Sequence, residues 1–411
     1  MGLLMRTTNH GRRTAGVFRL GAEAGRTVRA GRRARRRRTP ADLAVVTAVL
    51  LGTTVLSGCA TLDVDRPFVA PEATEAAPAP PLTRAWRIDA EAAFGPDAAV
   101  AYEDGRVLVS TRDGMVIVLN AADGTREGTG DFGDAVEGRV AVSGPLVFVP
   151  IAKGRAGLVG FDATRATRRW ALREGAHLAG PLLMDETLIA GAHDGTVRGL
   201  DPTFGTVRWA ARPDTVAQIR AAPVAASGLA IVADTEGAVR AYDPQTGTEV
   251  WSASAGAPVY RTPAASGDLV VVPTTRGRLV AFDGRSGSIR WVTEADPIAR
   301  WATPSIGEDV VYAGATDGIL RALDPATGET RWTHTLDGTI SVAPLAAGPF
   351  VYVGTYRREL VALDASTGEQ VWSEELGGRI KAGLVTAGGT LIVLAEPRFV
   401  YGFRPQGLAT R

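Results

Sequence analysis

The chain has 411 residues, of which 45% are hydrophobic and 6% aromatic, and it contains 49 Gly and 24 Pro. This composition is typical of a globular, turn-rich protein and excludes both a disordered and a collagen-like chain. Residues 1–58 hold 12 of the 45 basic residues but 2 of the 44 acidic ones, so without them the formal net charge falls from +1 to −9 and the chain has no basic footprint for nucleic acid.

The first predicted element is an export signal. A basic run at 31–38 (GRRARRRR) precedes an apolar run at 43–57, which is the order found in signal peptides. The apolar run is too short to span a bilayer comfortably as a mature helix. It ends in Leu-Ser-Gly-Cys, which resembles the lipobox of bacterial lipoproteins. We therefore predict a signal segment with lipobox at 1–58 and Cys59 as the lipid attachment site, carrying acyl chains such as palmitate.

Cys59 is the only cysteine, so no intramolecular disulfide can form. A lone cysteine elsewhere is usually a small buried apolar residue, but its place directly after the basic and apolar runs favours lipidation here. Residues 65–81 (DRPFVAPEATEAAPAPP) are rich in Pro and Ala without apolar periodicity. We expect residues 59–83 to be a semi-stiff tether between the lipid and the folded domain.

A tandem repeat begins after the tether and predicts the fold. Its copies end in Trp and have an Asp eight residues before it, as in LVALDASTGEQVW at 360–372. Six complete copies end at Trp170, Trp209, Trp251, Trp291, Trp332 and Trp372, with the aspartates at Asp162, Asp201, Asp243, Asp283, Asp324 and Asp364. A degenerate copy has Asn120 and Gly128 in these places. The spacing of 39 to 42 residues suits the four short strands of a propeller blade.

Counting the copies predicts eight blades. Trp86 ends an outer strand that has no inner strands before it, and the last segment, which ends at 399–403, has no outer strand. The two chain ends should therefore share one blade and leave no open edge. The predicted fold is all-β, an eight-bladed β-propeller of four-stranded antiparallel blades over residues 84–405, with a tail at 406–411. The Asp and Gly of each motif suit a tight hairpin turn, so we interpret both as structural.

The motif A-x-D-x-x-T-G-x-x-x-W, as at 322–332 and 362–372, resembles the tryptophan-docking repeat of quinoprotein-type propellers. The resemblance implies that Trp86 and the six motif tryptophans dock each blade onto its neighbour. It covers about 84–405 and is specific for fold rather than function. Two classes share it: dehydrogenases that use pyrroloquinoline quinone, and the BamB family of outer-membrane assembly lipoproteins.

Resemblance to the dehydrogenases would imply a longer chain, adjacent cysteines over the cofactor and an acidic calcium site. The repeats here have almost no insertions, and no Cys follows Cys59. The histidines stand singly, at His10, His177, His193 and His334, without the spacing of metal ligands. We interpret His193 as a turn residue and His334 as a strand residue. We therefore expect no catalytic residue, no metal and no cofactor.

The lipobox, the compact repeats and the eight blades favour the BamB-like interpretation. It implies a non-catalytic scaffold of the barrel assembly machinery, a monomer within a multi-subunit complex, which binds a BamA-like barrel-assembly subunit through propeller loops. Ala60, which is not Asp, resembles the sorting pattern of lipoproteins on the periplasmic face of the outer membrane. The alternatives are a quinone-dependent dehydrogenase and a secreted sensor or ligand-binding propeller.

Loops that lead into inner strands carry the candidate partner-binding residues. Before Pro223, Pro263 and Pro304 stand apolar or aromatic residues beside arginine, a combination enriched at protein interfaces. These candidates are Ile219, Arg220, Tyr260, Arg261, Arg300 and Trp301. In BamB the contact with BamA resembles such a stretch, although Ala217 is smaller than expected and Pro258 and Tyr260 replace an acidic pair. Alternatively, the arginines line the central channel and pair with acids such as Asp296.

Overall fold

The computed structural model describes residues 62–64, 78–102, 105–153, 157–173, 175–177, 179–213, 217–295 and 298–407. The predicted signal segment, Cys59 and His10 lie outside these residues. Within the described part, no helix has the length and apolar character needed to cross a bilayer. All regular structure here is β-strand.

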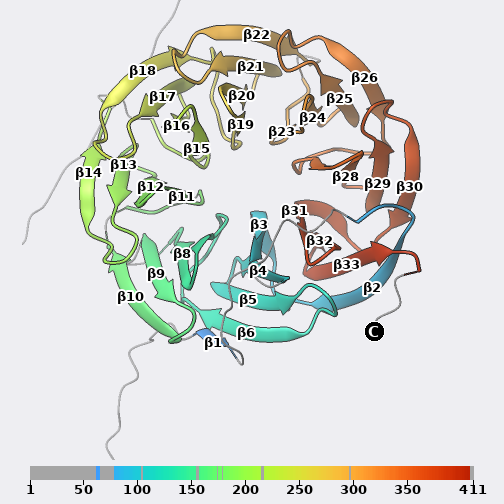
Figure 1. The fold of residues 1–411 in the computed structure, drawn as a ribbon, viewed down its shortest axis with the longest axis horizontal. Helices are drawn as coiled ribbons and strands as arrows, with labels where there is room; N and C mark the ends of the chain where they lie inside the picture. The colour runs from blue at the N-terminus through green and yellow to red at the C-terminus, as the bar shows by residue number, and fades with distance from the viewer. Residues whose placement is uncertain are drawn as a thin grey trace, which may run out of the picture. The chain divides into compact units, whose positions relative to one another are not determined.

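The strands form eight antiparallel sheets arranged in a ring, which confirms the predicted eight-bladed propeller (Figure 1). From inner to outer strand, blades 1 to 4 consist of β3 (Phe94–Tyr102), β4 (Arg106–Thr111), β5 (Met115–Asn120) and β6 (Arg126–Asp131); β7 (Ala141–Ser143), β8 (Leu146–Pro150), β9 (Leu158–Asp162) and β10 (Thr167–Leu172); β11 (Leu182–Met184), β12 (Thr187–Gly191), β13 (Val197–Leu200) and β14 (Val207–Ala211); and β15 (Val224–Ala226), β16 (Leu229–Ala233), β17 (Ala238–Tyr242) and β18 (Glu249–Ser254).

Blades 5 to 8 follow the same order around the ring. They consist of β19 (Ala264–Ser266), β20 (Leu269–Pro273), β21 (Arg278–Asp283) and β22 (Ile289–Glu294); β23 (Ser305–Ile306), β24 (Val311–Gly314), β25 (Ile319–Leu323) and β26 (Thr330–Thr335); β27 (Leu345–Ala347), β28 (Phe350–Gly354), β29 (Glu359–Asp364) and β30 (Gln370–Glu375); and β31 (Arg379–Ala387), β32 (Thr390–Glu396), β33 (Phe399–Pro405) and β2 (Leu82–Asp89).

The ring closes in blade 8, where the two ends of the propeller share one sheet as predicted. Strand β2 pairs antiparallel with β33, with Trp86 opposite Gly402 and Asp89 opposite Phe399. Before β2, the carbonyl of Pro78 accepts a hydrogen bond from the Tyr352 hydroxyl of blade 7. Three residues of the predicted tether also form a strand, β1 (Leu62–Val64), which adds a fifth member to blade 1 by pairing with β6.

The hydrophobic core lies between neighbouring blades rather than inside them. In β20 every residue is buried, and alternate side chains face opposite neighbours. Val270 and Val272 pack with Ile231 of blade 4, whereas Val271 packs with Val311 of blade 6. Strands covered on both faces read as continuous apolar runs, because neither face meets water.

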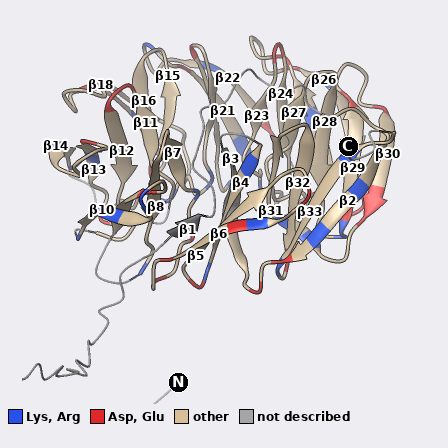
Figure 2. Cartoon of the chain, turned by 60° about the horizontal axis from the view of Figure 1, so that its bottom comes forward, with Lys and Arg blue, Asp and Glu red and all other residues tan. Residues whose placement is uncertain are grey.

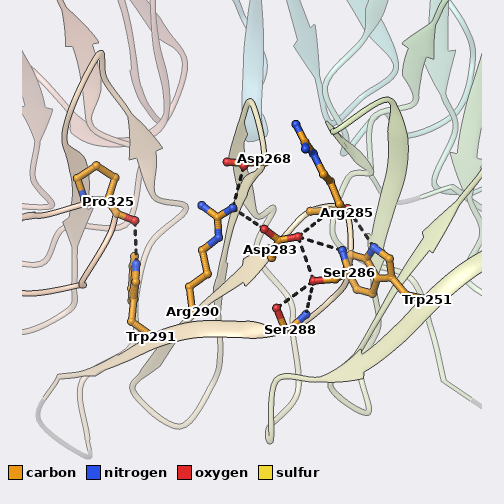
Figure 3. A network of polar contacts seen from close by, with 10 residues as sticks. Trp251, Asp268, Asp283, Arg285, Ser286, Ser288, Arg290, Trp291 and Pro325 are labelled. Atoms are coloured by element: carbon orange, nitrogen blue, oxygen red, sulfur yellow. Dashed lines mark hydrogen bonds and ion pairs between the residues drawn. The ribbon is translucent and has the colours of Figure 1, made fainter.

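The repeat motif ties each blade to the next through the indole N–H of its tryptophan (Figure 3). The Nε1–H of Trp251 donates to the carbonyl of Gly284 at 3.0 Å, and that of Trp291 donates to Pro325 at 2.9 Å. The same bond joins Trp86 to Ala121, Trp170 to Pro202, Trp209 to Pro244 and Trp332 to Ala365. Each of these rings also covers the glycine of its neighbour's turn, where a Cβ would meet the indole within 2.6 Å, as at Gly287 over Trp251.

The motif aspartate holds the turn that receives this tryptophan. Asp283 Oδ1 accepts the N–H groups of Arg285 and Ser286, while Oδ2 accepts from Arg290 at 2.5 Å. The arginine and the turn donors together hold the pKa of Asp283 well below its usual value. Asp324 has the same environment, and its bond with Arg331 lowers its pKa to about 2. These carboxylates stabilise turns.

Candidate partner-binding face

One face of the ring is built from two kinds of loop. The first joins the outer strand of a blade to the inner strand of the next, and the second is the turn between the two central strands of a blade. A backbone hydrogen bond links the two kinds around the ring: Thr235 N–H to Gln218 O, Thr275 N–H to Pro258 O, Thr316 N–H to Arg300 O and Tyr356 N–H to Thr339 O. Because the bond recurs, it defines which loop residues are structurally equivalent.

The residue after each acceptor is buried. Ile219, Val259, Trp301 and Ile340 occupy this position, and each is at most 3% exposed. A Cβ on Gly191 would lie 2.4 Å from Ile219 Cγ2, so the isoleucine packs directly on the backbone of the preceding blade. The indole of Trp301 donates to the carbonyl of Gly277 at 2.8 Å. This position anchors the loop.

Two predicted partner-binding residues therefore do not reach the surface. The expectation that both members of each pair are exposed is wrong for Ile219 and Trp301, which are 2% and 3% exposed. The pairs also differ in register, because the loop before Pro304 is one residue shorter than the loop before Pro223. Trp301 is thus equivalent to Ile219, although counting back from proline aligns it with Arg220.

The other four predicted residues come together at one opening. The guanidinium of Arg220 lies 5.6 Å from the ring centroid of Tyr260, and its Nε–H donates to Gln218 Oε1 at 3.0 Å. Tyr260 is 45% exposed. Arg261 and Arg300 line the same pocket of about 460 Å³, whose wall includes Trp301. Neither arginine forms an ion pair within the described part of the chain.

A larger cavity of about 690 Å³ continues from this pocket along the inner ends of the blades. It shares Arg220, Tyr260 and Arg261 with the pocket and is otherwise lined mainly by small and apolar residues. The arginines thus line the mouth of the channel and also belong to the loop face. Asp296, the acid considered as their partner, lies outside the described residues.

Among the lining residues that were not predicted, Glu137 and Tyr356 have the largest polar side chains. Glu137 projects from the loop after blade 1, and Tyr356 lies in the turn that follows β28. Tyr356 is equivalent to Thr235 and Thr316 in the recurring backbone bond, so aligning the central turns as well as the loops would have found it.

The arrangement suits recognition of a surface rather than bond chemistry. Guanidinium groups beside tyrosine combine forked donors with apolar area, as in the centres of protein interfaces. His193 lies in a turn near Arg220, and His334 on β26 contacts the carbonyl of Gly368 at 3.0 Å. Among the described residues, no group of three or more His, Cys, Asp or Glu is placed to hold a metal.

A family model described as outer membrane protein assembly factor BamB matches residues 82–217, 193–343 and 335–406, which together cover the ring. The chain belongs to the BamB family. No curated protein sequence matches the chain.

Solved structures show the same fold at low sequence identity. BamB from Moraxella catarrhalis is 21% identical, with a TM-score of 0.66 over 80% of this chain and 99% of that one. A quinohemoprotein alcohol dehydrogenase from Comamonas testosteroni is 16% identical, with a TM-score of 0.64 over 78% of this chain and 76% of that one. The computationally designed Ika8 protein is also 16% identical, with a TM-score of 0.64 over 76% and 98%. At these identities the likeness is one of fold.

Proposed function

We propose that the chain is a non-catalytic scaffold lipoprotein of the outer-membrane β-barrel assembly machinery, anchored on the periplasmic face through acylated Cys59. Its membership of the BamB family carries this proposal, and the match extends over the whole ring. The lipobox-like residues before Cys59 support the anchor.

We further propose that the loop face binds a BamA-like barrel-assembly subunit through Arg220, Tyr260, Arg261 and Arg300. The exposed tyrosine and the three arginines at one opening support this surface. Ile219 and Trp301 position the loops from below, because both are buried against neighbouring backbone. A partner that presents carboxylates or backbone carbonyls would satisfy the guanidinium donors.

A dehydrogenase function receives less support from the residues present. The acidic calcium site and adjacent cysteines implied by resemblance to the quinoproteins have no counterpart in the described ring. The lining residues of the central cavity do not fit such a cofactor site, and we derive no reaction through one.

The test is pull-down of the barrel-assembly subunit by the full lipoprotein carrying Arg220→Ala with Tyr260→Ala. Both side chains are at the surface, so the double variant should fold and lose at least tenfold in affinity if they form the centre of the contact. The matched control is Phe204→Ala with Arg285→Ala, because Phe204 is 69% exposed and both residues lie in turns that follow motif aspartates. Equal retention of the partner by both double variants would contradict this surface.

A further inference from the structure

Four arginines with exposed side chains lie on the outer rim of blades 1 and 2. Arg126 is on β6, Arg168 and Arg169 are on β10, and Arg173 directly follows β10. We call these four residues the basic rim; Figure 2 shows blue segments on β10 and β6. None of the four forms an ion pair or a side-chain hydrogen bond with any residue that the structure describes. This is a local exception in a chain whose net charge after residue 58 is −9.

Arg169 has no ion pair among the described residues because Arg165 binds the aspartate that its equivalents bind in other blades. In blades 3, 5 and 6 the arginine seven residues after the motif aspartate binds that aspartate: Arg208 to Asp201 at 2.6 Å, Arg290 to Asp283 at 2.5 Å and Arg331 to Asp324 at 2.8 Å. Arg169 holds the same position relative to Asp162. Here Arg165 Nη1 binds Asp162 Oδ2 at 2.7 Å instead, so within the described part of the chain the guanidinium of Arg169 has no carboxylate partner and can bind an outside anion.

Arg169 occupies a β-bulge that recurs in other blades, where Arg208, Arg290 and Arg331 hold the same place. Arg168 pairs with Phe161 and Trp170 pairs with Gly160, so Arg169 is the extra residue between them. Neighbouring side chains on a regular strand point to opposite faces, but at a bulge two consecutive residues can be presented outward. Arg126 and Arg168 each stand two residues before the motif Trp position, so they are equivalent on adjacent blades.

The N-terminal segment reaches the same rim. Strand β1 pairs with β6 along its outer edge, with Leu62 opposite Gly130 and Val64 opposite Gly128 (Figure 1). Cys59 is three residues before Leu62, and covalent geometry limits the distance between their Cα atoms to about 11 Å. An acyl chain on Cys59 would therefore enter the bilayer beside blade 1.

We propose that the basic rim faces the membrane and binds the anionic headgroups of phospholipids, so that the disc is held by its edge. The inference rests on the proposed function in one respect, the acylation of Cys59. The acyl chains on Cys59 would attach the protein at one point, and a basic patch adds a second contact that fixes which edge faces the membrane. Asp123, Asp131 and Asp63 lie on or beside β6 and β1, and four arginines against these three carboxylates leave a net positive charge. Held by its edge, the ring keeps its loop face open to a protein partner.

The experiment uses the single cysteine of the mature chain. The protein purified without acylation is coupled through Cys59 to a maleimide lipid in vesicles of phosphatidylcholine, with or without phosphatidylglycerol. Modification of each arginine by phenylglyoxal is then followed by mass spectrometry. We expect Arg126, Arg168, Arg169 and Arg173 to react several-fold more slowly on the anionic vesicles, and this protection to disappear at high salt. Arg276 and Arg285 of blade 5 should react with phenylglyoxal at the same rate on vesicles with and without phosphatidylglycerol.

A pair of matched variants tests the arginines themselves. Arg168→Gln with Arg169→Gln should weaken the contact roughly 25-fold, since each arginine near an anionic surface contributes about fivefold, and Arg173 should regain its reactivity. Arg276→Gln with Arg285→Gln removes the same charge from blade 5 and should leave Arg173 protected. Equal modification of the rim on both vesicle types would overturn the proposal, as would equal protection by free inorganic phosphate. Acylation of Cys59 is measured separately by incorporation of labelled palmitate. A rim that does not bind lipid can therefore be distinguished from a chain that is not acylated.

Discussion

His177 makes the stability of the ring depend on pH. Its side chain is 1% exposed, in the loop position that Ile219 and Ile340 occupy in other blades. A Cβ on Gly157 would lie 2.8 Å from His177 Nδ1, which shows that the imidazole is packed closely against the backbone of blade 2. Burial first, and then the positive charge of Arg198, lower the pKa of His177 to about 4, although Asp194 opposes the shift.

The sign and size of the effect follow from proton linkage. An unfolded histidine has a pKa near 6.5, so between about pH 6.5 and pH 4 the unfolded chain binds a proton that the folded chain does not. The contribution of His177 is fully present above about pH 6.5 and falls as the pH decreases, by about 2 kcal/mol at pH 5 and about 3 kcal/mol below pH 4.

The measurement is urea unfolding of the parent and of His177→Ile at several pH values from about 7.5 to about 5. Isoleucine stands at the same place in three other loops, at Ile219, Ile340 and Ile380, whose N–H groups make the backbone bond that His177 makes, so the variant should keep the fold. Carboxylates titrate in both proteins, and their contribution cancels in the difference. The parent should lose about 2 kcal/mol more than the variant over this range. Parallel curves for the two proteins would refute the reasoning.

Two further predictions concern the joints between blades. Trp251→Phe leaves the carbonyl of Gly284 without its donor and should lower the unfolding free energy by about 1–3 kcal/mol more than Trp372→Phe does. Trp372 is the control because no hydrogen bond of its indole is found among the described residues. Equal losses in urea unfolding would argue against the indole bond. Gly191→Ala places a methyl 2.4 Å from Ile219 Cγ2 and should lower the unfolding free energy by about 1–3 kcal/mol. In a double-mutant cycle, Ile219→Ala should recover part of this loss. Strict additivity of the two changes would contradict the contact.

The ring could be predicted from sequence because its determinants are local and repeated. Each Asp–Trp spacing marks one hairpin and one outer strand, so the number of copies fixes the number of blades, and unpaired ends at Trp86 and Phe403 require a shared sheet. The loop face was harder to predict. Proline aligns Trp301 with Arg220, whereas the backbone bond from Thr316 to Arg300 aligns it with Ile219, and only the three-dimensional register distinguishes them.

Two features that the repeat motif does not determine are the ion pair of Asp162 and the pairing of strand β1. Asp162 can bind either Arg165 or Arg169, and the turn geometry that selects Arg165 includes Ala166 at a φ of 51°. Strand β1 is three residues long, which is too short for a periodic signal in the sequence. The pairing of β1 and the lack of an ion pair at Arg169 among the described residues therefore could not be predicted from the sequence.

At the junction of blades 1 and 2 the repeat lacks both the docking tryptophan and the glycine that receives it, and the outer strand of blade 1 carries an additional strand. Gly128 replaces the tryptophan of blade 1, and Ala166 replaces the glycine that receives it in blade 2, where the other turns have Gly under an indole. Each change permits the other, because without the indole the methyl of Ala166 meets no ring. Phe132 and Phe161 pack there at 5.8 Å and restore apolar contact across the seam. The outer edge of β6 at Gly128 pairs with β1, which places Leu62–Val64 beside the rim whose arginines have no ion-pair partner among the described residues.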